Sequence, residues 1–192
     1  MLKIVLLRHF ATAGNLRKRY IGSTDEPLCK EGIRVLDHIH YPKVEAVFTS
    51  PLIRCQETAK LIYPEISPII CMNLRECDFG EFENKSYEEL SNNPKYQAWV
   101  DSNGTLPFPM GEDPKAFKKR CVMAFQAVVE KSLKAGYRTI ALVVHGGTIM
   151  SILECYATPK KDYYYWHSEN GKGYIADIEE SKGRMINLCT IH

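Results

Sequence analysis

The residue types best suited to chemistry lie at the ends of apolar runs. Residues 4–7 are aliphatic and predict a strand buried on both faces, and Arg8 and His9 follow it directly. A second apolar run, residues 139–144, leads into His145 and two glycines. Arginine offers a planar fork to phosphate oxygens, and histidine near neutral pH serves as a nucleophile or a base. Together these residue types indicate chemistry on a phosphoryl group.

A third apolar run, residues 44–48, ends at Thr49 and Ser50 and precedes a predicted helix that carries Arg54. If these strands are parallel, their carboxyl ends share one edge of the sheet, where open α/β sheets bind ligands. Gly146, just after His145, would let backbone N–H groups approach an anion at a helix N-terminus. Singly, each residue also fits an ordinary structural position, so the inference depends on their conjunction.

Strands and helices are predicted to alternate along the chain. This alternation predicts an α/β three-layer sandwich, with a mostly parallel central sheet and helices on both faces. Six helices are predicted: Glu31–Ile39, a helix with Ser50 as N-cap and Pro51 in its first turn that ends near Tyr63, a capping-box helix from Ser86, Lys95–Asp101, a long amphipathic helix from Asp113-Pro114 to Gly136, and Thr148–Tyr156. A further strand is predicted over Ile66–Met72. The chain is predicted to end in an antiparallel hairpin of Gly173–Ile178 with Met185–Ile191.

The length of 192 residues predicts one domain over residues 1–192. Residues 73–112 are more polar and irregular than the rest. We expect this segment to form an excursion over the active face of the sheet.

The composition gives no reason to expect nucleic acid or a membrane as a partner. The formal net charge is +2, and no apolar stretch approaches the length of a transmembrane helix or a signal sequence. The seven cysteines contain no Cys-x-x-Cys, and Cys121 and Cys155 fit buried positions, so a reducing cytoplasm is expected. His38 and His40 form the one close histidine pair and have no obvious third ligand. We therefore expect no metal and no cofactor.

Six blocks of the chain, taken in order, resemble the histidine phosphatase superfamily, the phosphoglycerate mutase-like proteins. The first block, Arg8-His9-x-x-Thr12-x-x-Asn15, resembles the family motif Arg-His-Gly-x-Thr-x-x-Asn. The other blocks are Gly22-x-x-Asp25-x-Pro27-Leu28-x-x-x-Gly32, Ser50-Pro51-Leu52-x-Arg54-Cys55-x-x-Thr58-Ala59, Leu74-x-Glu76-x-x-Phe79-Gly80-x-x-Glu83, Pro109-x-Gly111-Glu112 with Phe117 and Arg120, and Val143-Val144-His145-Gly146-Gly147. Two positions depart from the family pattern: Phe10 replaces a glycine and Asp113 replaces a serine.

The resemblance implies a phosphoric monoester hydrolase of the histidine acid phosphatase type. His9 would attack phosphorus and form a phosphohistidine, and Glu76 would protonate the leaving oxygen. His145 would act with the binding residues to hold the phosphoryl oxygens. The binding residues implied are Arg8, Asn15, Arg54 and Gly146. Asp78, Glu81 and Glu83 lie near Glu76 in the sequence and remain alternative acids.

The short chain favours a phosphatase of a small phosphate ester over the longer phosphoglycerate mutases, which are the alternative. The aromatic run at residues 163–166 resembles α-ribazole phosphatases, which act in assembly of the cobalamin nucleotide loop, but the same run also suits packing under the final hairpin. A non-catalytic module that binds phosphorylated ligands is a third reading, disfavoured because His9 and Glu76 are both present. The sequence is also compatible with a homodimer.

Overall fold

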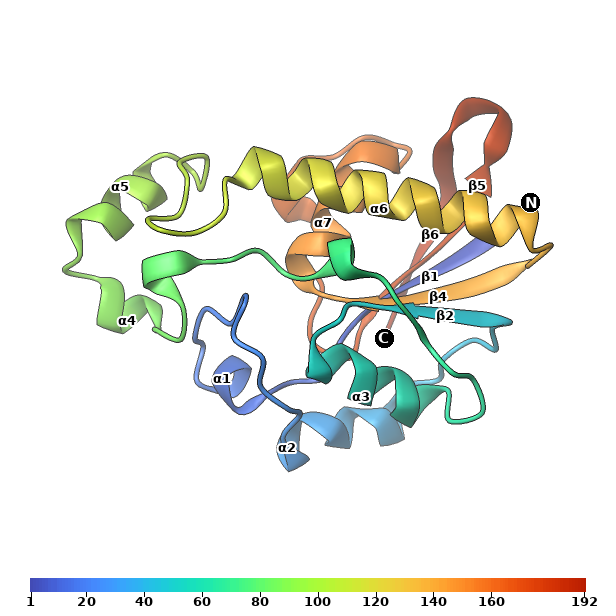
Figure 1. Ribbon diagram of the computed structural model, residues 1–192, viewed down its shortest axis with the longest axis horizontal. Helices are drawn as coiled ribbons and strands as arrows, with labels where there is room; N and C mark the ends of the chain where they lie inside the picture. The colour runs from blue at the N-terminus through green and yellow to red at the C-terminus, as the bar shows by residue number, and fades with distance from the viewer.

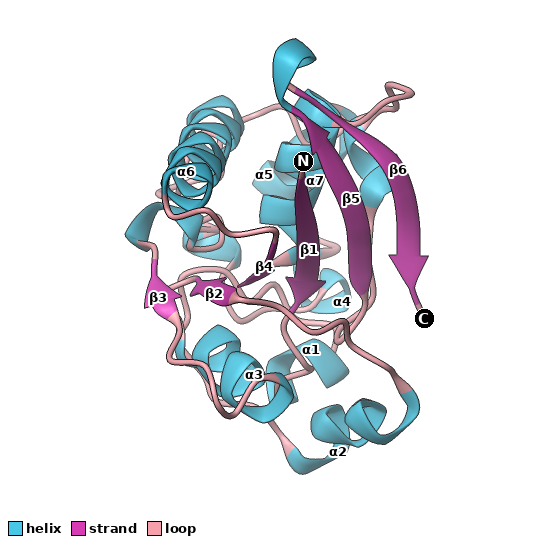
Figure 2. Cartoon of the chain, turned by 90° about the vertical axis from the view of Figure 1, so that its right-hand side faces the viewer, coloured by secondary structure: helices cyan, strands magenta, loops and turns pink.

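One six-stranded sheet forms the centre of the molecule, and helices cover both of its faces (Figures 1 and 2). The computed structural model describes all of residues 1–192. The strands are β1 Leu2–Arg8, β2 Ala46–Thr49, β3 Ile69–Ile70, β4 Thr139–Val144, β5 Gly173–Glu179 and β6 Arg184–Ile191. The α-helices are α1 Ala13–Leu16, α2 Lys30–Ile33, α3 Ile53–Ile62, α4 Tyr87–Leu90, α5 Pro94–Asp101, α6 Pro114–Lys134 and α7 Gly146–Tyr156. Short 3-10 helices span Arg34–His38, Met72–Leu74, Gly80–Phe82, Tyr163–Trp166 and Glu180–Lys182.

The strand order is β3-β2-β4-β1-β5-β6, and the first four strands in this order are parallel. β5 runs antiparallel to β1, and β6 runs antiparallel to β5, so the C-terminal hairpin extends the parallel sheet on one side. The predicted α/β architecture is confirmed. Because β1, β4 and β2 are parallel neighbours, they end at the same edge of the sheet. The residues that follow these three strands are therefore brought together.

Alternate residues of the central strands pack into two separate hydrophobic cores. Ile4 and Leu6 of β1 face α6 and α7, where they pack with Phe125 among other apolar side chains. Val5 and Leu7 face the opposite side, toward α3. Burial on both faces explains why β1 and β4 are continuous apolar runs. No helix of the structure has the length and apolarity needed to cross a membrane.

Three predicted elements differ from those observed. β3 spans only Ile69–Ile70 rather than Ile66–Met72, and only the first part of the predicted Glu31–Ile39 helix is α-helical, with 3-10 geometry from Arg34. The prediction of Ser50 as N-cap was wrong. α3 begins at Ile53, and its N-cap residue is Leu52, which provides no side-chain cap. The Ser50 hydroxyl accepts the Leu52 N–H at 3.3 Å and is also hydrogen-bonded to His145 at the functional site.

The other capping signals of the sequence are confirmed. The Ser86 hydroxyl accepts the Glu89 N–H, and the Glu89 carboxylate accepts the Ser86 N–H. Asp113 caps α6 through the N–H groups of Lys115 and Ala116, both at 2.9 Å. Asp113, which replaces the family's serine, thus serves the helix N-terminus.

The segment 73–112 leaves the sheet after β3 and returns with α6. It carries α4 and α5, which lie at one end of the molecule close to α1 (Figure 1). Its aromatic side chains form a third apolar cluster with the start of α6, separate from the two sheet cores. This cluster places a second wall opposite the carboxyl ends of the strands.

Replacing Phe125 by alanine should lower the free energy of unfolding by about 3–5 kcal/mol, because it removes a ring that is 1% exposed and leaves a cavity. Met123→Ala is the matched control on the same helix, where the side chain is 57% exposed. It should change the free energy of unfolding by less than about 0.5 kcal/mol. Urea denaturation measures both, and equal losses would mean that α6 does not bury the face assigned here.

Candidate active site

The strand register sets His9, His145 and Ser50 side by side. Arg8 pairs with Val144 across β1 and β4, and the next residue along each strand is a histidine. The rings of His9 and His145 lie 5.2 Å apart between centroids. On the other side of β4, Nε2 of His145 and Oγ of Ser50 are hydrogen-bonded at 2.7 Å. The expected meeting of the strand ends is therefore observed.

The surroundings of His9 fix both its tautomer and its charge. Its Nδ1 lies 2.6 Å from the Phe10 carbonyl oxygen, which can only accept, so Nδ1 carries the proton and Nε2 keeps a lone pair. Burial, with the nearby charges of Arg54 and Arg8, holds the pKa of His9 well below its usual range. A neutral imidazole with a free Nε2 is the form that can attack an electrophile.

Phe10 occupies the position after His9 without disturbing this arrangement. Its ring is fully buried and packs edge-on against Tyr41, with the ring centroids 6.3 Å apart. Its N–H donates to the Thr58 hydroxyl at 3.0 Å. The departure from the family's glycine thus adds packing behind the histidine.

His145 is buried and neutral as well. Burial is the main reason that its pKa lies well below the usual histidine value, with further lowering by Arg54 and His9. Ser50 holds its Nε2, and the Cys55 sulfur lies 3.5 Å from the same nitrogen. His145 is therefore oriented by polar groups from the start of α3.

Arg8 and Arg54 are held by neutral backbone oxygens. Arg54, fully buried, donates to the carbonyls of Thr24 at 2.7 Å and Gly22 at 2.8 Å. Arg8 donates to the Ser168 carbonyl at 2.7 Å. The Nε atom of each arginine is buried and has no protein partner. Two unpartnered, charged donors beside two histidines fit the oxygens of a phosphoryl group.

The loop that holds Arg54 is itself held by Glu83. The Glu83 carboxylate accepts the N–H groups of Gly22 and Ser23 at 3.1 and 2.8 Å, and the Thr24 hydroxyl at 2.7 Å. A methyl group on Gly22 would lie 2.4 Å from a Glu83 oxygen, so the close approach requires glycine. Glu83 is thereby occupied with structure and is not free as an acid.

Asn15 and Gly146 complete the same corner. Asn15 Oδ1 accepts from the Thr12 N–H and from Asn170 Nδ2, so its amide nitrogen remains available to a ligand in the pocket that it lines. A methyl group on Gly146 would lie 3.5 Å from Arg8 Nε, which places this glycine beside the unpartnered donor. The N–H of Gly147 is already used, because it donates to Glu76 Oε2 at 3.2 Å.

Glu76 is the carboxyl that faces this corner. Its side chain is 8% exposed, and burial raises its pKa above the usual glutamate value. Its two oxygens accept from the N–H groups of Cys77 at 3.0 Å and Gly147 at 3.2 Å. Of the alternative acids, Asp78 accepts the Gly80 N–H and Glu81 pairs with Lys95 at 2.8 Å. A buried carboxyl with a raised pKa suits proton donation.

A pocket of about 560 Å³ extends from Arg8, Asn15, Glu76 and Gly146 toward the 73–112 segment. His9, His145 and Arg54 are buried and are not among its lining residues. Two of its cations are already paired with carboxylates, Lys118 with Glu154 at 2.8 Å and Arg19 with Glu89 at 3.0 Å. Aromatic side chains form much of its wall: Tyr20, Phe79, Trp99, Phe108, Phe117, Tyr163 and Tyr164.

The aromatic run at residues 163–166 is divided between two roles. Tyr163 and Tyr164 line the pocket, whereas Trp166 is buried against Tyr174 of β5 with ring centroids 5.8 Å apart. Tyr165 is 62% exposed. Packing under the final hairpin is therefore confirmed for Trp166, and contact of Tyr163 or Tyr164 with a substrate stays a prediction.

Among the cysteines, Cys77 lines the pocket and Cys55 lies against His145. All seven cysteines are free thiols; Cys121 is buried as predicted, but Cys155 is exposed, so that prediction was wrong. Cys155 falls on the outward face of α7, where the helical period departs from the apolar stripe. His38 and His40 are exposed, and no three His, Cys, Asp or Glu side chains gather as a metal-binding group.

A family model for the histidine phosphatase superfamily (branch 1) matches residues 4–190. The chain belongs to the histidine phosphatase superfamily. A relative from Yersinia pestis named "Probable phosphoglycerate mutase GpmB" is 31% identical over 166 residues, with 80% of this chain and 75% of the relative covered.

Solved structures of this superfamily share the fold. The phosphoglycerate mutase from Thermus thermophilus has a TM-score of 0.72 and 26% identity, covering 100% of this chain and 99% of that one. The α-ribazole phosphatase from Shigella flexneri has a TM-score of 0.75 and 24% identity, covering 93% of this chain and 92% of that one. The phosphoglycerate mutase-like fold expected from the sequence motifs is confirmed.

The two buried histidines should make folding stability depend on pH. Both stay neutral in the folded protein while the unfolded chain takes up protons below about pH 6.5, so stability falls as pH drops below that value. His145→Asn should reduce the slope of the free energy of unfolding against pH by up to about 1.4 kcal/mol per pH unit. Denaturation between pH 5 and 7 measures it. The exposed His40→Gln is the control, and equal slopes for wild type and His145→Asn would contradict the prediction.

Proposed function

We propose that the protein is a metal-independent phosphomonoesterase that acts through a phosphohistidine on a small phosphorylated metabolite. One observation carries this proposal. A neutral histidine with a free Nε2, His9, lies beside Arg8 and Arg54, whose buried Nε donors have no protein partner, with a buried carboxyl, Glu76, facing the same corner. This arrangement supplies a nucleophile, anion ligands and a proton donor.

The first step forms a bond between Nε2 of His9 and phosphorus while the ester P–O bond breaks. The leaving oxygen takes the proton from Glu76, whose raised pKa keeps a neutral fraction available. Arg8, Arg54 and His145, with Asn15 and Gly146, hold the phosphoryl oxygens. In the second step, water attacks the phosphohistidine and passes a proton to the Glu76 carboxylate, and the P–N bond breaks to release phosphate and restore His9.

The pocket favours a leaving group that carries an aromatic ring. Several aromatic side chains line it, and two of its cations, Lys118 and Arg19, are paired with Glu154 and Glu89, while Lys115 has no carboxylate partner. A benzimidazole nucleotide such as α-ribazole 5′-phosphate matches this chemistry, because its flat base can stack on aromatic side chains. One of the structural relatives is also named as an α-ribazole phosphatase.

A phosphoglycerate mutase is the second candidate, since one relative and one structural neighbour carry that name. A mutase would return the phosphoryl group from His9 to another oxygen of the substrate. Phosphoglycerate carries a carboxylate that needs its own cation. Lys118 and Arg19 are already paired with glutamates, whereas Lys115, an exposed residue of the pocket lining, has no carboxylate partner and is available to bind one.

His9→Ala should abolish phosphate release, because no other neutral imidazole takes its position. The measurement is hydrolysis with chelator present of α-ribazole 5′-phosphate, 3-phosphoglycerate, sugar phosphates, nucleotides and p-nitrophenyl phosphate. Wild type treated with substrate should also gain the mass of one phosphoryl group on His9. Release that persists in His9→Ala or requires a divalent ion would overturn the proposal, and isomerisation of 3-phosphoglycerate without release would favour the mutase.

Tyr164→Ala should lower kcat/KM for α-ribazole 5′-phosphate by about 3- to 10-fold, since an aromatic contact is worth about 0.5–1.5 kcal/mol. Its effect on glycerol phosphate, which has no ring to stack, should be within about 2-fold. Tyr165→Ala, on the same short helix but outside the pocket lining, is the control. Equal losses on both substrates would mean that Tyr164 does not contact the leaving group.

A further inference from the structure

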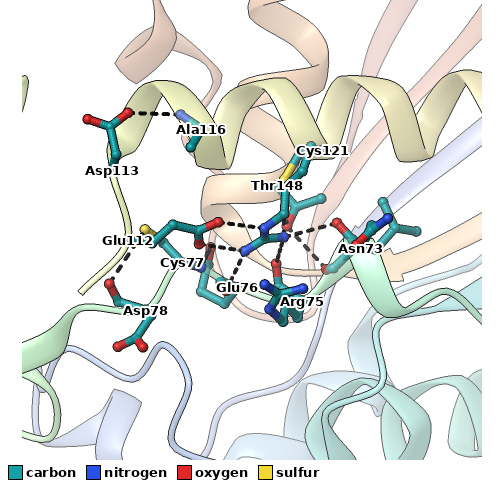
Figure 3. A network of polar contacts seen from close by, with 12 residues as sticks. Asn73, Arg75, Glu76, Cys77, Asp78, Glu112, Asp113, Ala116, Cys121 and Thr148 are labelled. Atoms are coloured by element: carbon teal, nitrogen blue, oxygen red, sulfur yellow. Dashed lines mark hydrogen bonds and ion pairs between the residues drawn. The ribbon is translucent and has the colours of Figure 1, made fainter. Parts of the chain in front are cut away.

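Arg120 of α6 uses every donor of its guanidinium in the protein. Nε and one terminal nitrogen donate to the two oxygens of Glu112, both at 2.7 Å. The remaining N–H groups donate to three backbone carbonyls, those of Asn73 at 2.9 Å, Arg75 at 2.8 Å and Glu76 at 3.0 Å. In Figure 3, Glu112 lies at one side of this network and Asn73 at the other, with Glu76 and Arg75 between them. Because all five N–H groups of this planar guanidinium are hydrogen-bonded, they fix the position of the Glu112 carboxylate relative to the three carbonyls.

The three carbonyls belong to the short stretch that carries Glu76. This stretch begins in the 3-10 helix Met72–Leu74, which contains Asn73, and has no regular secondary structure at Glu76 itself. Arg120, by contrast, stands on a 21-residue helix whose N-terminus is capped by Asp113. Glu112 is tied back to the same stretch, because its N–H donates to the Asp78 carbonyl at 2.9 Å. An irregular segment is thereby attached at both ends to a rigid helix.

We propose that the Arg120–Glu112 pair is the positioning device for the Glu76 carboxyl. This inference rests on the proposed function, in which Glu76 protonates the leaving oxygen. Arg120 is bound to the backbone of Glu76, while the carboxyl oxygens are held by the N–H groups of Cys77 and Gly147. It is a positioning residue, since it reaches neither the pocket corner nor the carboxyl.

Position matters here because a general acid works only within hydrogen-bond reach of the proton's destination, and a displacement of about 1 Å can cost about 100-fold in rate. Releasing the three carbonyls would let the stretch shift and would separate the Glu76 carboxyl from the N–H of Gly147 on α7. Lysine cannot replace the fork, because one ammonium has three donors and no planar geometry.

The leaving group provides the readout that separates positioning from stability. An alkoxide is a strong base and needs the acid's proton to depart, whereas p-nitrophenolate departs without it. Loss of proton donation should therefore slow the hydrolysis of alkyl phosphates and leave the hydrolysis of p-nitrophenyl phosphate nearly unchanged. A variant that merely lowers the amount of folded enzyme slows both substrates by the same factor.

The experiment compares kcat/KM for glycerol phosphate and p-nitrophenyl phosphate in four variants. Glu76→Gln, the reference, should lose about 100-fold or more on glycerol phosphate. Arg120→Lys and Arg120→Met should lose about 10- to 100-fold on glycerol phosphate and less than about 3-fold on p-nitrophenyl phosphate. Lys119→Met, an exposed cation at the preceding position of α6, is the matched control and should match wild type on both.

Each other outcome decides against a defined part of the scheme. If Glu76→Gln shows no dependence on the leaving group, the acid assigned under the proposed function is wrong. If Glu76→Gln shows it and the Arg120 variants do not, the positioning inference alone is wrong. If Arg120→Met fails to fold, Arg120→Lys and Glu112→Gln carry the test, and failure of all three to fold would make the pair a requirement of the fold and overturn the inference.

Discussion

Two buried guanidinium groups held by neutral acceptors are the constraint on which the site depends. Removing a cation from water is costly, and proteins commonly offset this cost with a carboxylate. Here Arg54 is held by carbonyl oxygens of Gly22 and Thr24, and Arg8 by that of Ser168. Carbonyls satisfy N–H groups without cancelling the charge, so the corner stays positive and an incoming phosphate does not have to displace an acid. The same positive charge helps to keep His9 and His145 neutral.

The cations outside this corner are treated differently. Lys118, Arg19 and Arg120 each pair with a glutamate. These pairs reduce the positive potential away from the place where the phosphoryl group is proposed to bind, and they leave Lys115 as a cation of the pocket lining without a carboxylate partner. Two further glutamates hold parts of the site in place. Glu83 binds the loop whose carbonyls hold Arg54, and Glu112 binds Arg120 of α6, which holds the backbone at Glu76.

Much of the fold and the meeting of the histidines could be predicted from the sequence, because both follow from local patterns. Apolar runs predict parallel strands, and parallel strands share an edge, which brings His9 beside His145. Features that depend on partners far along the chain could not be predicted. Ser50 has the local signature of a helix cap, yet it binds His145, which is 95 residues away. The roles of Glu83 and Arg120 likewise emerge only when distant loops meet.

β3 and Cys155 show a second limit. A short apolar run such as Ile66–Met72 is compatible with several conformations, and only Ile69–Ile70 finds a partner strand in β2. Cys155 has the composition of a buried residue, but its place on α7 turns it outward. Apolar character alone does not say which side of an element a neighbour will cover.

The contact between Arg8 and Ser168 joins residues 160 positions apart. The first residues of the phosphoryl corner are therefore oriented by a part of the chain that is synthesised much later. β1 itself pairs with β5, which follows Ser168 in the chain. The phosphate site proposed here therefore requires the completed fold, and an anion bound there would stabilise only the folded molecule.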